Sequence, residues 1–385
     1  MSMLTKEDLI QIRRDLHQIP ELALEEFQTH DYLLKEIAQF NQEFLTVREL
    51  PKLPTAILVR VEGSNPIKTI GYRADIDALP VTEETGLPFS SNHEGVMHAC
   101  GHDMHMTVAL AVLNYFSEHQ PKDNMLFFFQ PAEEEKCGGL LAYEMGVFEG
   151  EWRPDEFYGL HDSPDLPAGT IGCRMGTLFA GSTEVDVDFI GTSGHAAFPH
   201  NANDMVVAAS AFIGQIQTIV SRSIDPVRSG VITFGKFEAG TIRNVITGKA
   251  HLEGTIRGLE QSMIEELVAR IKDVAEGIAR SFNCEVVPTF EQGGYLPVEN
   301  NPELTKNFID YMEANHGDQF KLTEPAMTGE DFGYLLSKIP GTMFWLGVDD
   351  SHPLHSSELS PSEDALEPGV KAIVDFLEYR MQEEA

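Results

Sequence analysis

The segment from Met97 to His105 holds the densest group of side chains that can bind a metal ion or transfer a proton. Cys100 and His102 stand two positions apart here, with Gly101 between them. A thiolate sulfur and an imidazole nitrogen are normal zinc donors, and a loop containing glycine allows both to reach one ion. A buried helix N-terminus with hydrogen-bonded histidines would contain the same residue types. We favour the metal-binding interpretation.

A second polar cluster follows an apolar run at residues 125–130. Glu133, Glu134 and Glu135 are consecutive, and three neighbouring carboxylates repel one another unless they lie on a solvated turn or around a cation. In the functional interpretation, one glutamate ligates metal and its neighbour accepts the proton of an attacking water. A solvated acidic turn is the alternative.

Three further residues stand where an expected strand gives way to a loop. His161 follows residues 157–160, Asp75 follows a strand that ends at Arg73, and His355 follows a strand at 342–347. Each histidine alone is weak support, because most single histidines are ordinary core or surface residues. Ligands of open α/β sheets bind beyond the carboxyl ends of the strands. We therefore expect a common site there, with Asp75 able to orient a ligating histidine.

Apolar runs alternate with helical patterns on both sides of the middle of the chain. Strands are expected at 56–61, 69–74, 125–130 and 157–160, with helices from Thr5 to about Pro20, at 29–40 and at 104–118. After Gln292 the pattern resumes with a helix from Pro302, a strand at 342–347 and a closing helix from about Glu363. This alternation predicts a mostly parallel sheet covered by helices on both faces.

The pattern changes near Phe179. Strands are expected at 184–190, 231–237, 250–257 and 285–288, with helices at 203–221 and 262–281. The order β-α-β-β-α-β predicts a small ferredoxin-like domain inserted into the larger one. We expect residues 1–179 and 290–385 to form the catalytic domain and residues 180–289 to form the insert.

Composition restricts the classes of function. The 385 residues are 42% hydrophobic and 23% charged, as in globular proteins, and the net charge is −34. A surface this negative repels nucleic acids and anionic membranes. The sequence shows no apolar run of about 18 residues and no signal-peptide pattern, so we expect a cytoplasmic protein. Four cysteines are too few for a disulfide scaffold.

Six motifs in this order resemble the co-catalytic metallopeptidases of the aminoacylase and carboxypeptidase type, specifically their hippurate-hydrolase-like amidohydrolase branch. They lie at residues 13–21, 72–80, 98–103 (HACGHD), 130–134 (QPAEE), 194–200 (GHAAFPH) and 327–332 (MTGEDF). The resemblance covers essentially the whole chain. It implies a zinc-exopeptidase-like α/β/α catalytic domain whose ferredoxin-like insert acts as a lid and dimerisation domain, and hence a homodimer.

The resemblance also implies a role for each matching position. Two divalent ions (Zn, Mn, Co or Ni) would be held by five ligands, with the thiolate as the bridge: Cys100, His102, Glu134, His161 and His355. Glu133 would be the general base and later the acid, and His195 of the same or the partner subunit would stabilise the oxyanion. Asp75 matches an orienting aspartate. Arg73 stands where the wider superfamily has a metal histidine, which leaves the role of Asp75 open.

Segments 204–210, 251–257 and 343–347 are most similar to branch members that release acetate from N-acetyl-diaminopimelate in the acetylated route to lysine. That substrate implies Arg243, Asn244 and Arg257 as partners for carboxylates, and Glu330 or Asp331 as a partner for the ammonium group. Arg257 and Glu330 could equally form internal ion pairs. The alternative enzyme would act on a benzoyl or indoleacetyl amino acid. A metal-dependent amino-acid sensor would need a broken site, and every candidate ligand is present.

Overall fold

The structure is a computed structural model that describes residues 4–382. The chain divides into two compact units. Unit 1 comprises Met1–Leu178, Val298–Glu324 and Asp331–Ala385, and unit 2 comprises Phe179–Pro297 and Pro325–Glu330. Unit 2 extends to residue 297, beyond the predicted end of the insert at residue 289. The reason is that β12 continues to Glu291 and the carbonyl of Tyr295 accepts the N–H of Ser182.

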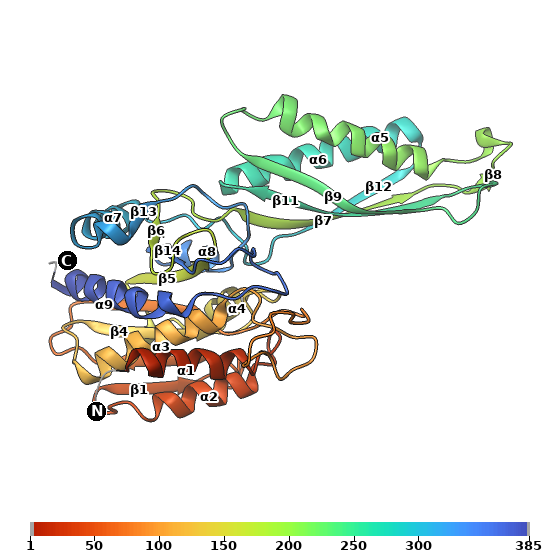
Figure 1. The fold of residues 1–385 in the computed structure, drawn as a ribbon. Helices are drawn as coiled ribbons and strands as arrows, with labels where there is room; N and C mark the ends of the chain where they lie inside the picture. The colour runs from red at the N-terminus through yellow and green to blue at the C-terminus, as the bar shows by residue number, and fades with distance from the viewer. Residues whose placement is uncertain (1–3, 383–385) are drawn as a thin grey trace. The chain divides into compact units, whose positions relative to one another are not determined.

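Unit 1 is built on an eight-stranded sheet in the order β1-β2-β4-β3-β5-β14-β6-β13 (Figure 1). Its strands are β1 Leu45–Glu49, β2 Ile57–Val61, β3 Thr69–Asp75, β4 Asn124–Gln130, β5 Glu156–Ser163, β6 Ile171–Cys173, β13 Phe320–Leu322 and β14 Gly341–Gly347. The central strands β4, β3, β5 and β14 are parallel, whereas β1 and β2 on one side and β6 on the other pair antiparallel. The sheet is therefore mixed: β3, β4, β5 and β14 match predicted strands and are parallel, whereas β2 matches the predicted strand at 56–61 but pairs antiparallel.

Helices cover both faces of this sheet. They are α1 Lys6–His17, α2 Phe27–Ile37, α3 His102–Glu118, α4 Gly138–Glu144, α7 Pro302–Asn315, α8 Phe332–Leu336 and α9 Leu366–Gln382, with short 3-10 turns η1 Gly150–Trp152, η4 Gly317–Gln319 and η5 Glu363–Ala365. Successive strand residues point to opposite faces. Phe127 accordingly joins the core beneath α1, α3 and α9, while Phe128 packs edge-on against Phe148 on the other face.

The parallel strands place their carboxyl ends at one edge of the sheet. β3 ends at Asp75, β4 at Gln130 and β5 just after His161, all at this edge. The helix α3 begins beside them, directly after Gly101, and is buried on nearly all sides. A helix that is apolar all round belongs in the middle of a core. Because α3 is held in the core, the loop directly before it, which carries Cys100, is held in place as well.

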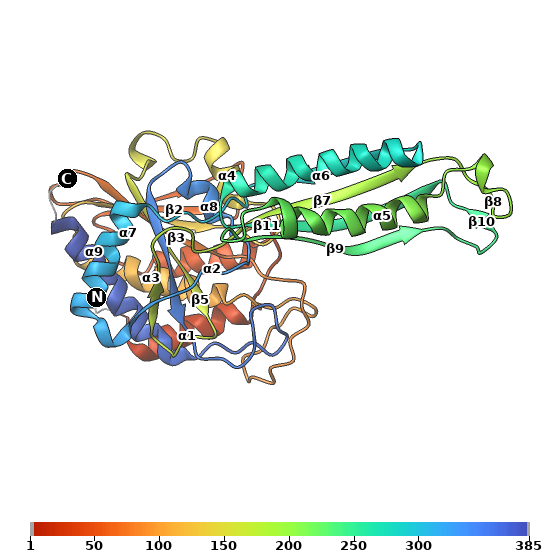
Figure 2. The ribbon, with the colours of Figure 1, turned by 90° about the horizontal axis from the view of Figure 1, so that it is seen from above.

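Unit 2 has a four-stranded antiparallel sheet in the order β12-β7-β11-β9. The strands are β7 Gly181–Ile190, β9 Gly230–Ala239, β11 Lys249–Gly258 and β12 Glu285–Glu291, and a separate pair is formed by β8 Gly194–His195 and β10 Val245–Ile246. The helices α5 Met205–Thr218 and α6 Gln261–Phe282 lie along one face of the sheet (Figures 1 and 2). The element order β7-α5-β9-β11-α6-β12 is that of the predicted ferredoxin-like insert.

One segment of unit 2 is long and apolar enough to cross a membrane by length and composition. It runs from Met205 to Ser223 and joins α5 to the π-helical turn η3 Ile219–Ser223. The buried side of α5, including Phe212 and Ile216, packs into the core of unit 2. Packing in this core explains the apolar residues of the buried side, whereas Val206 and Val207 of the same helix are exposed.

Candidate metal centre

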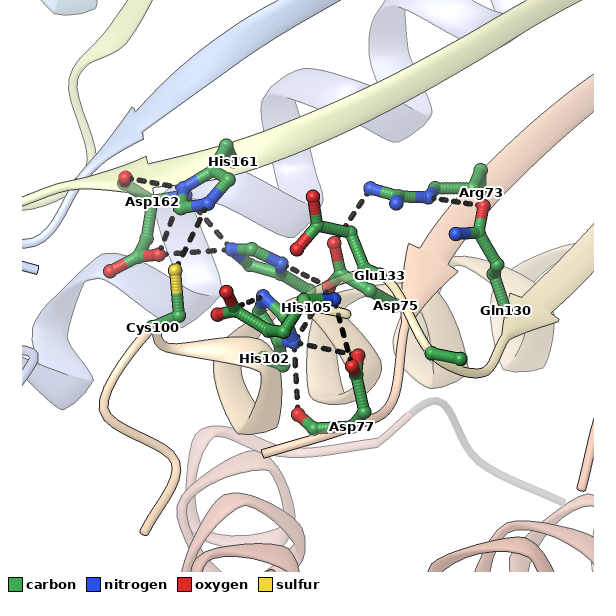
Figure 3. Close-up of polar contacts among 12 residues, drawn as sticks. Arg73, Asp75, Asp77, Cys100, His102, His105, Gln130, Glu133, His161 and Asp162 are labelled. Carbon is green, nitrogen blue, oxygen red and sulfur yellow. Dashed lines mark hydrogen bonds and ion pairs between the residues drawn. The ribbon is translucent and has the colours of Figure 1, made fainter. Parts of the chain in front are cut away.

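Five side chains able to ligate metal converge at the carboxyl edge of the unit 1 sheet. The ligand atoms of Cys100, His102 and His161 lie within 4.8 Å of one another, and so do those of Cys100, Glu134 and His355. Cys100 belongs to both groups, and its Sγ lies 3.5 Å from His161 Nε2 (Figure 3). Glu134 Oε1 lies 3.8 Å from His102 Nε2 and 3.5 Å from His355 Nε2. The structure thus brings together all five predicted ligands in two groups that share one sulfur.

The loop that presents Cys100 and His102 depends on Gly101. Its φ of +73° lies in the left-handed region, where side chains other than glycine are strained. A Cβ at this position would lie 2.5 Å from the carboxylate of Asp162, which packs directly against the loop. Only glycine fits here without moving the ligands on either side.

We expect Gly101→Ala to lose most of its metal and much of its stability. The left-handed strain costs about 1–2 kcal/mol, and the clash with Asp162 adds about 1–3 kcal/mol. Thermal unfolding and metal content after dialysis measure both effects. Gly95→Ala is the matched control, because Gly95 has a φ of +79° with no atom within 4 Å of its Cβ position. Equal losses in the two variants would contradict this account.

His355 reaches the centre from a loop far along the chain. Its backbone φ is +68°, and its N–H donates to the carbonyl oxygen of Ala99 at 2.6 Å. Met97, Ala99 and Leu359 form a small buried cluster beside this bond, with Leu354 packed against it. Apolar packing and one backbone hydrogen bond therefore hold the last ligand next to the first.

Two buried polar atoms of the centre lack a hydrogen-bond partner among the described residues, and both can ligate a cation. His102 Nδ1 donates to the carbonyl oxygen of Asp77 at 2.9 Å, so its Nε2 is left to face the centre as a lone-pair donor. Within residues 4–382, His102 Nε2 and Glu134 Oε1 are buried and have no hydrogen-bond partner. Buried polar atoms without partners are costly unless an ion or water satisfies them. This donor set fits a metal ion.

The electrostatics of the centre also favour a cation. Burial raises the pKa of the Cys100 thiol well above its usual value, and Glu134 and Asp162 raise it further. Burial lowers the pKa of His102, but Asp75 and Asp77 outweigh that effect and raise it well above the usual value. Bound positive charge would reverse both shifts, because metal ligation requires a thiolate and a neutral imidazole.

Glu133 lies beside the ligands and is itself buried. Its carboxylate belongs to a group with His102 and Glu134 whose ligand atoms lie within 4.8 Å of one another. The N–H of Asp331 donates to Glu133 Oε1 at 3.3 Å. Glu133 is thus placed to exchange protons with a molecule bound at the centre.

Comparison with known proteins decides the family. The model of "Peptidase family M20/M25/M40" matches residues 71–379 of this chain. The chain belongs to this family.

Members of the M20 family resemble the chain over its whole length. A relative from Limosilactobacillus reuteri (strain DSM 20016), named N-acetyldiaminopimelate deacetylase, is 69% identical over 99% of this chain and 100% of the relative. One with the same name from Pediococcus pentosaceus is 57% identical over 98% of each chain. The solved structure of a Bacillus subtilis protein described as a dinuclear metal binding peptidase from the M20 family matches with a TM-score of 0.85 and 30% identity over 98% of each chain. These matches confirm the predicted family and fold class.

Asp75 of this M20 chain contacts His105 and not a predicted ligand. Its Oδ1 lies 2.5 Å from His105 Nδ1, and its Oδ2 accepts from Arg73 at 2.6 Å, whereas His102 Nδ1 is 3.8 Å away. The other ring nitrogen of His105 faces Asp162 at 3.0 Å. Hydrogen bonds therefore link Asp75, His105 and Asp162 into a buried chain next to Cys100 and His161.

Four residues that support the centre had no role predicted from the sequence: Asp77, His105, Asp162 and Gln130, which donates to Asp331. The spacing of His105 was a usable signal, because it stands three positions after His102 and therefore shares its helix face. Asp77 accepts from His102 through its backbone carbonyl, which residue type does not reveal, and its carboxylate lies 3.4 Å from the same ring nitrogen. Asp162 follows His161, and no pattern distinguished its role from that of a surface carboxylate.

The carboxylate of Asp331 is engaged inside unit 1. It accepts hydrogen bonds from Arg73 at 2.9 Å, from Gln130 at 2.7 and 2.8 Å, and from the N–H of Gly139 at 2.9 Å. Its charge therefore belongs to the support of the centre, and not to the substrate ammonium that was considered for it. Glu330 is buried and belongs to unit 2.

Unit 2 brings together three of its four other predicted site residues. The strand β8 pairs His195 with Val245 of β10, and the carbonyl of Asn244 accepts the N–H of Ala196. His195, Arg243 and Asn244 are all exposed. Arg257 lies at the other end of the unit 2 sheet. It stands opposite Ser182 in the β7–β11 ladder, at the start of β7, about 25–30 Å along the strands from the end near β8. Arg257 bonds to Thr255 Oγ1 and to the carbonyl of Ile256.

Proposed function

We propose that this chain hydrolyses N-acetyl-LL-diaminopimelate to LL-diaminopimelate and acetate. The observation that carries the proposal is the convergence of Cys100, His102, Glu134, His161 and His355 beside the buried Glu133. The choice of substrate is supported by relatives named N-acetyldiaminopimelate deacetylase, which are 57–69% identical along nearly the whole chain. The four free cysteines fit a reducing cytoplasm, where we place the enzyme.

The five ligands would hold a pair of divalent ions, which lower the pKa of a water molecule and polarise the acetyl carbonyl. Glu133 accepts a proton from this water as the water oxygen adds to the carbonyl carbon. The same carboxyl group then gives the proton to the departing nitrogen as the C–N bond breaks. C–N cleavage leaves acetic acid and the amine, the carboxyl proton passes to the amine to give acetate and an ammonium group, and Glu133 is again ionised.

His195, Arg243 and Asn244 are proposed to act on the substrate from unit 2. An imidazole can donate to the oxyanion of the tetrahedral intermediate, and an arginine can bind a carboxylate with two parallel hydrogen bonds. Their adjacency around β8 and β10 supports a joint role. They lie at the end of the unit 2 sheet away from Ser182, which is close in sequence to the junction with unit 1. We propose that they act on the centre of the same chain or of a partner subunit.

We propose a homodimer formed through β9, an edge strand of unit 2. β9 is ten residues long and has exposed apolar side chains, including Val231 and Phe237. An edge strand of this kind is open to pairing with another chain. The opposite edge, β12, contains Pro288, which cannot donate a backbone hydrogen bond. The exposed Val206 and Val207 of α5 extend the apolar surface of the same unit.

We expect Phe237→Lys to shift the protein from dimer toward monomer, because a charge would be buried at the proposed interface. Light scattering coupled to size exclusion measures the mass, which should fall from twice that of one chain. Ile67→Lys in unit 1 is the control, since Ile67 is also exposed and lies outside β9. A wild-type protein of single-chain mass at micromolar concentration would refute the dimer.

Acetate release from a substrate panel tests the function directly. N-acetyl-LL-diaminopimelate should give the highest kcat/KM, and rates with N-acetyl-lysine, which lacks the distal carboxylate, and with hippurate should be at least tenfold lower. Each assay is run with and without added divalent metal. A preference for benzoyl or indoleacetyl amino acids would instead select the alternative substrate class.

A further inference from the structure

Glu26 is a buried acid to which the proposed chemistry gives no role. Its side chain is fully buried at the start of α2, and it does not cap that helix. Burial raises its pKa to about 7, and the charge of Asp77 adds to the effect. Within residues 4–382, no lysine, arginine or histidine forms an ion pair with it. A buried glutamate without a cation is costly and calls for a specific reason.

The contact of Glu26 points to the turn that carries the catalytic glutamates. Its Oε1 accepts the N–H of Ala132 at 2.9 Å, across 106 positions of sequence. Ala132 directly precedes Glu133 and Glu134, and its φ of +57° lies in the left-handed region. An alanine there costs about 1–2 kcal/mol, so surrounding contacts must hold it.

Two further hydrogen bonds hold the same turn. The N–H of Glu134 donates to Asp77 Oδ2 at 2.9 Å, and the carbonyl of Ala132 accepts the N–H of Gly138 at 3.0 Å. The bond to Glu26 fixes the peptide between Pro131 and Ala132, one residue before Glu133.

We propose that Glu26 is a positioning residue that holds the strained Ala132 peptide and so sets the direction of Glu133 and Glu134. The inference rests on the proposed hydrolase function and deepens it. Glu26 needs only to present an oxygen acceptor to Ala132. A glutamine at this position keeps such an oxygen, whereas a methionine of similar size removes it.

The test compares Glu26→Gln with Glu26→Met in acetate release, with metal content and thermal unfolding measured on the same samples. We expect Glu26→Met to lose about 10- to 100-fold in kcat, as for other residues that orient an active-site group. Its KM should change less than threefold, and Glu26→Gln should keep kcat within threefold of wild type. Full kcat in Glu26→Met, or equal losses in both variants, would overturn the inference.

Two additions keep the test decisive. If Glu26→Met does not fold, Glu26→Asp replaces it, because the shorter side chain keeps the acid but does not reach Ala132; a kcat equal to wild type would then refute the proposal. Combining Glu26→Met with Glu133→Gln should give less than the product of the two single losses, and fully multiplicative losses would also count against it. Retained activity in the single variant Glu133→Gln would refute the proposed function. If Glu133→Gln loses activity but Glu26→Met keeps full activity, only the role of Glu26 is refuted.

Discussion

Glu133→Gln should lower kcat for acetate release by about 10³–10⁴, because general acid–base catalysis by a positioned side chain typically contributes 10²–10⁴ and this residue serves both proton transfers. Glutamine has nearly the same size and keeps an oxygen to accept the N–H of Asp331. Folding and metal binding should therefore be preserved. The measurement is single-turnover acetate release, with metal content and thermal unfolding as parallel readouts.

Glu135→Gln is the matched control for this prediction. Glu135 stands in the same turn, but it is exposed and pairs with Lys136 at the surface. Its substitution removes the same charge from the same segment without touching the centre, so kcat should stay within twofold of wild type. Comparable losses in the two variants would show that charge near the turn matters, and not the proton transfer assigned to Glu133.

Cys100→Ala should remove at least one of two bound ions per chain and lower acetate release by about 10³ or more. Cys100 is common to both ligand groups, so its loss leaves each group with two protein ligands. Metal content after gel filtration measures the first effect. Cys100→Asp should recover part of the metal and activity, because a carboxylate oxygen is also a ligand for divalent metal ions.

Cys173→Ala is the control for Cys100→Ala. Cys173 is also fully buried, and burial raises its pKa to about 12, but it lies on β6 and belongs to none of the ligand groups described above. Truncation there should cost stability without changing the number of ions bound. Two ions retained in Cys100→Ala would rule out the thiolate bridge.

The five-ligand set was predicted from the family resemblance, whereas the strand pattern predicted only a common site, because side chains at the carboxyl ends of parallel strands meet at one edge. Glu134 and His161 are near such strand ends, whereas Cys100 was predicted from its spacing of two positions from His102. His355 was predicted as a weak candidate after the strand at 342–347, and the resemblance made it a ligand; its approach depends on a backbone hydrogen bond to Ala99 and on a left-handed φ. Neither feature leaves a residue pattern that can be read from one sequence.

Other features depended on contacts that local sequence does not encode. The strands β1, β6 and β13 are three to five residues long, too short for a clear alternation pattern. Arg257 and Arg243 were grouped by charge, but the antiparallel register of β7 and β11 places Arg257 at the other end of unit 2. Glu26 and Ala132 are 106 positions apart, so only the folded chain reveals their hydrogen bond.

Anomalous diffraction from crystals loaded with zinc or manganese tests the central claim most directly. Two peaks per chain are expected about 3–4 Å apart, both within bonding distance of Cys100 Sγ, with His102, His161, Glu134 and His355 completing the ligands. A single site away from Cys100, or no site among these five residues in a protein that releases acetate, would contradict the account.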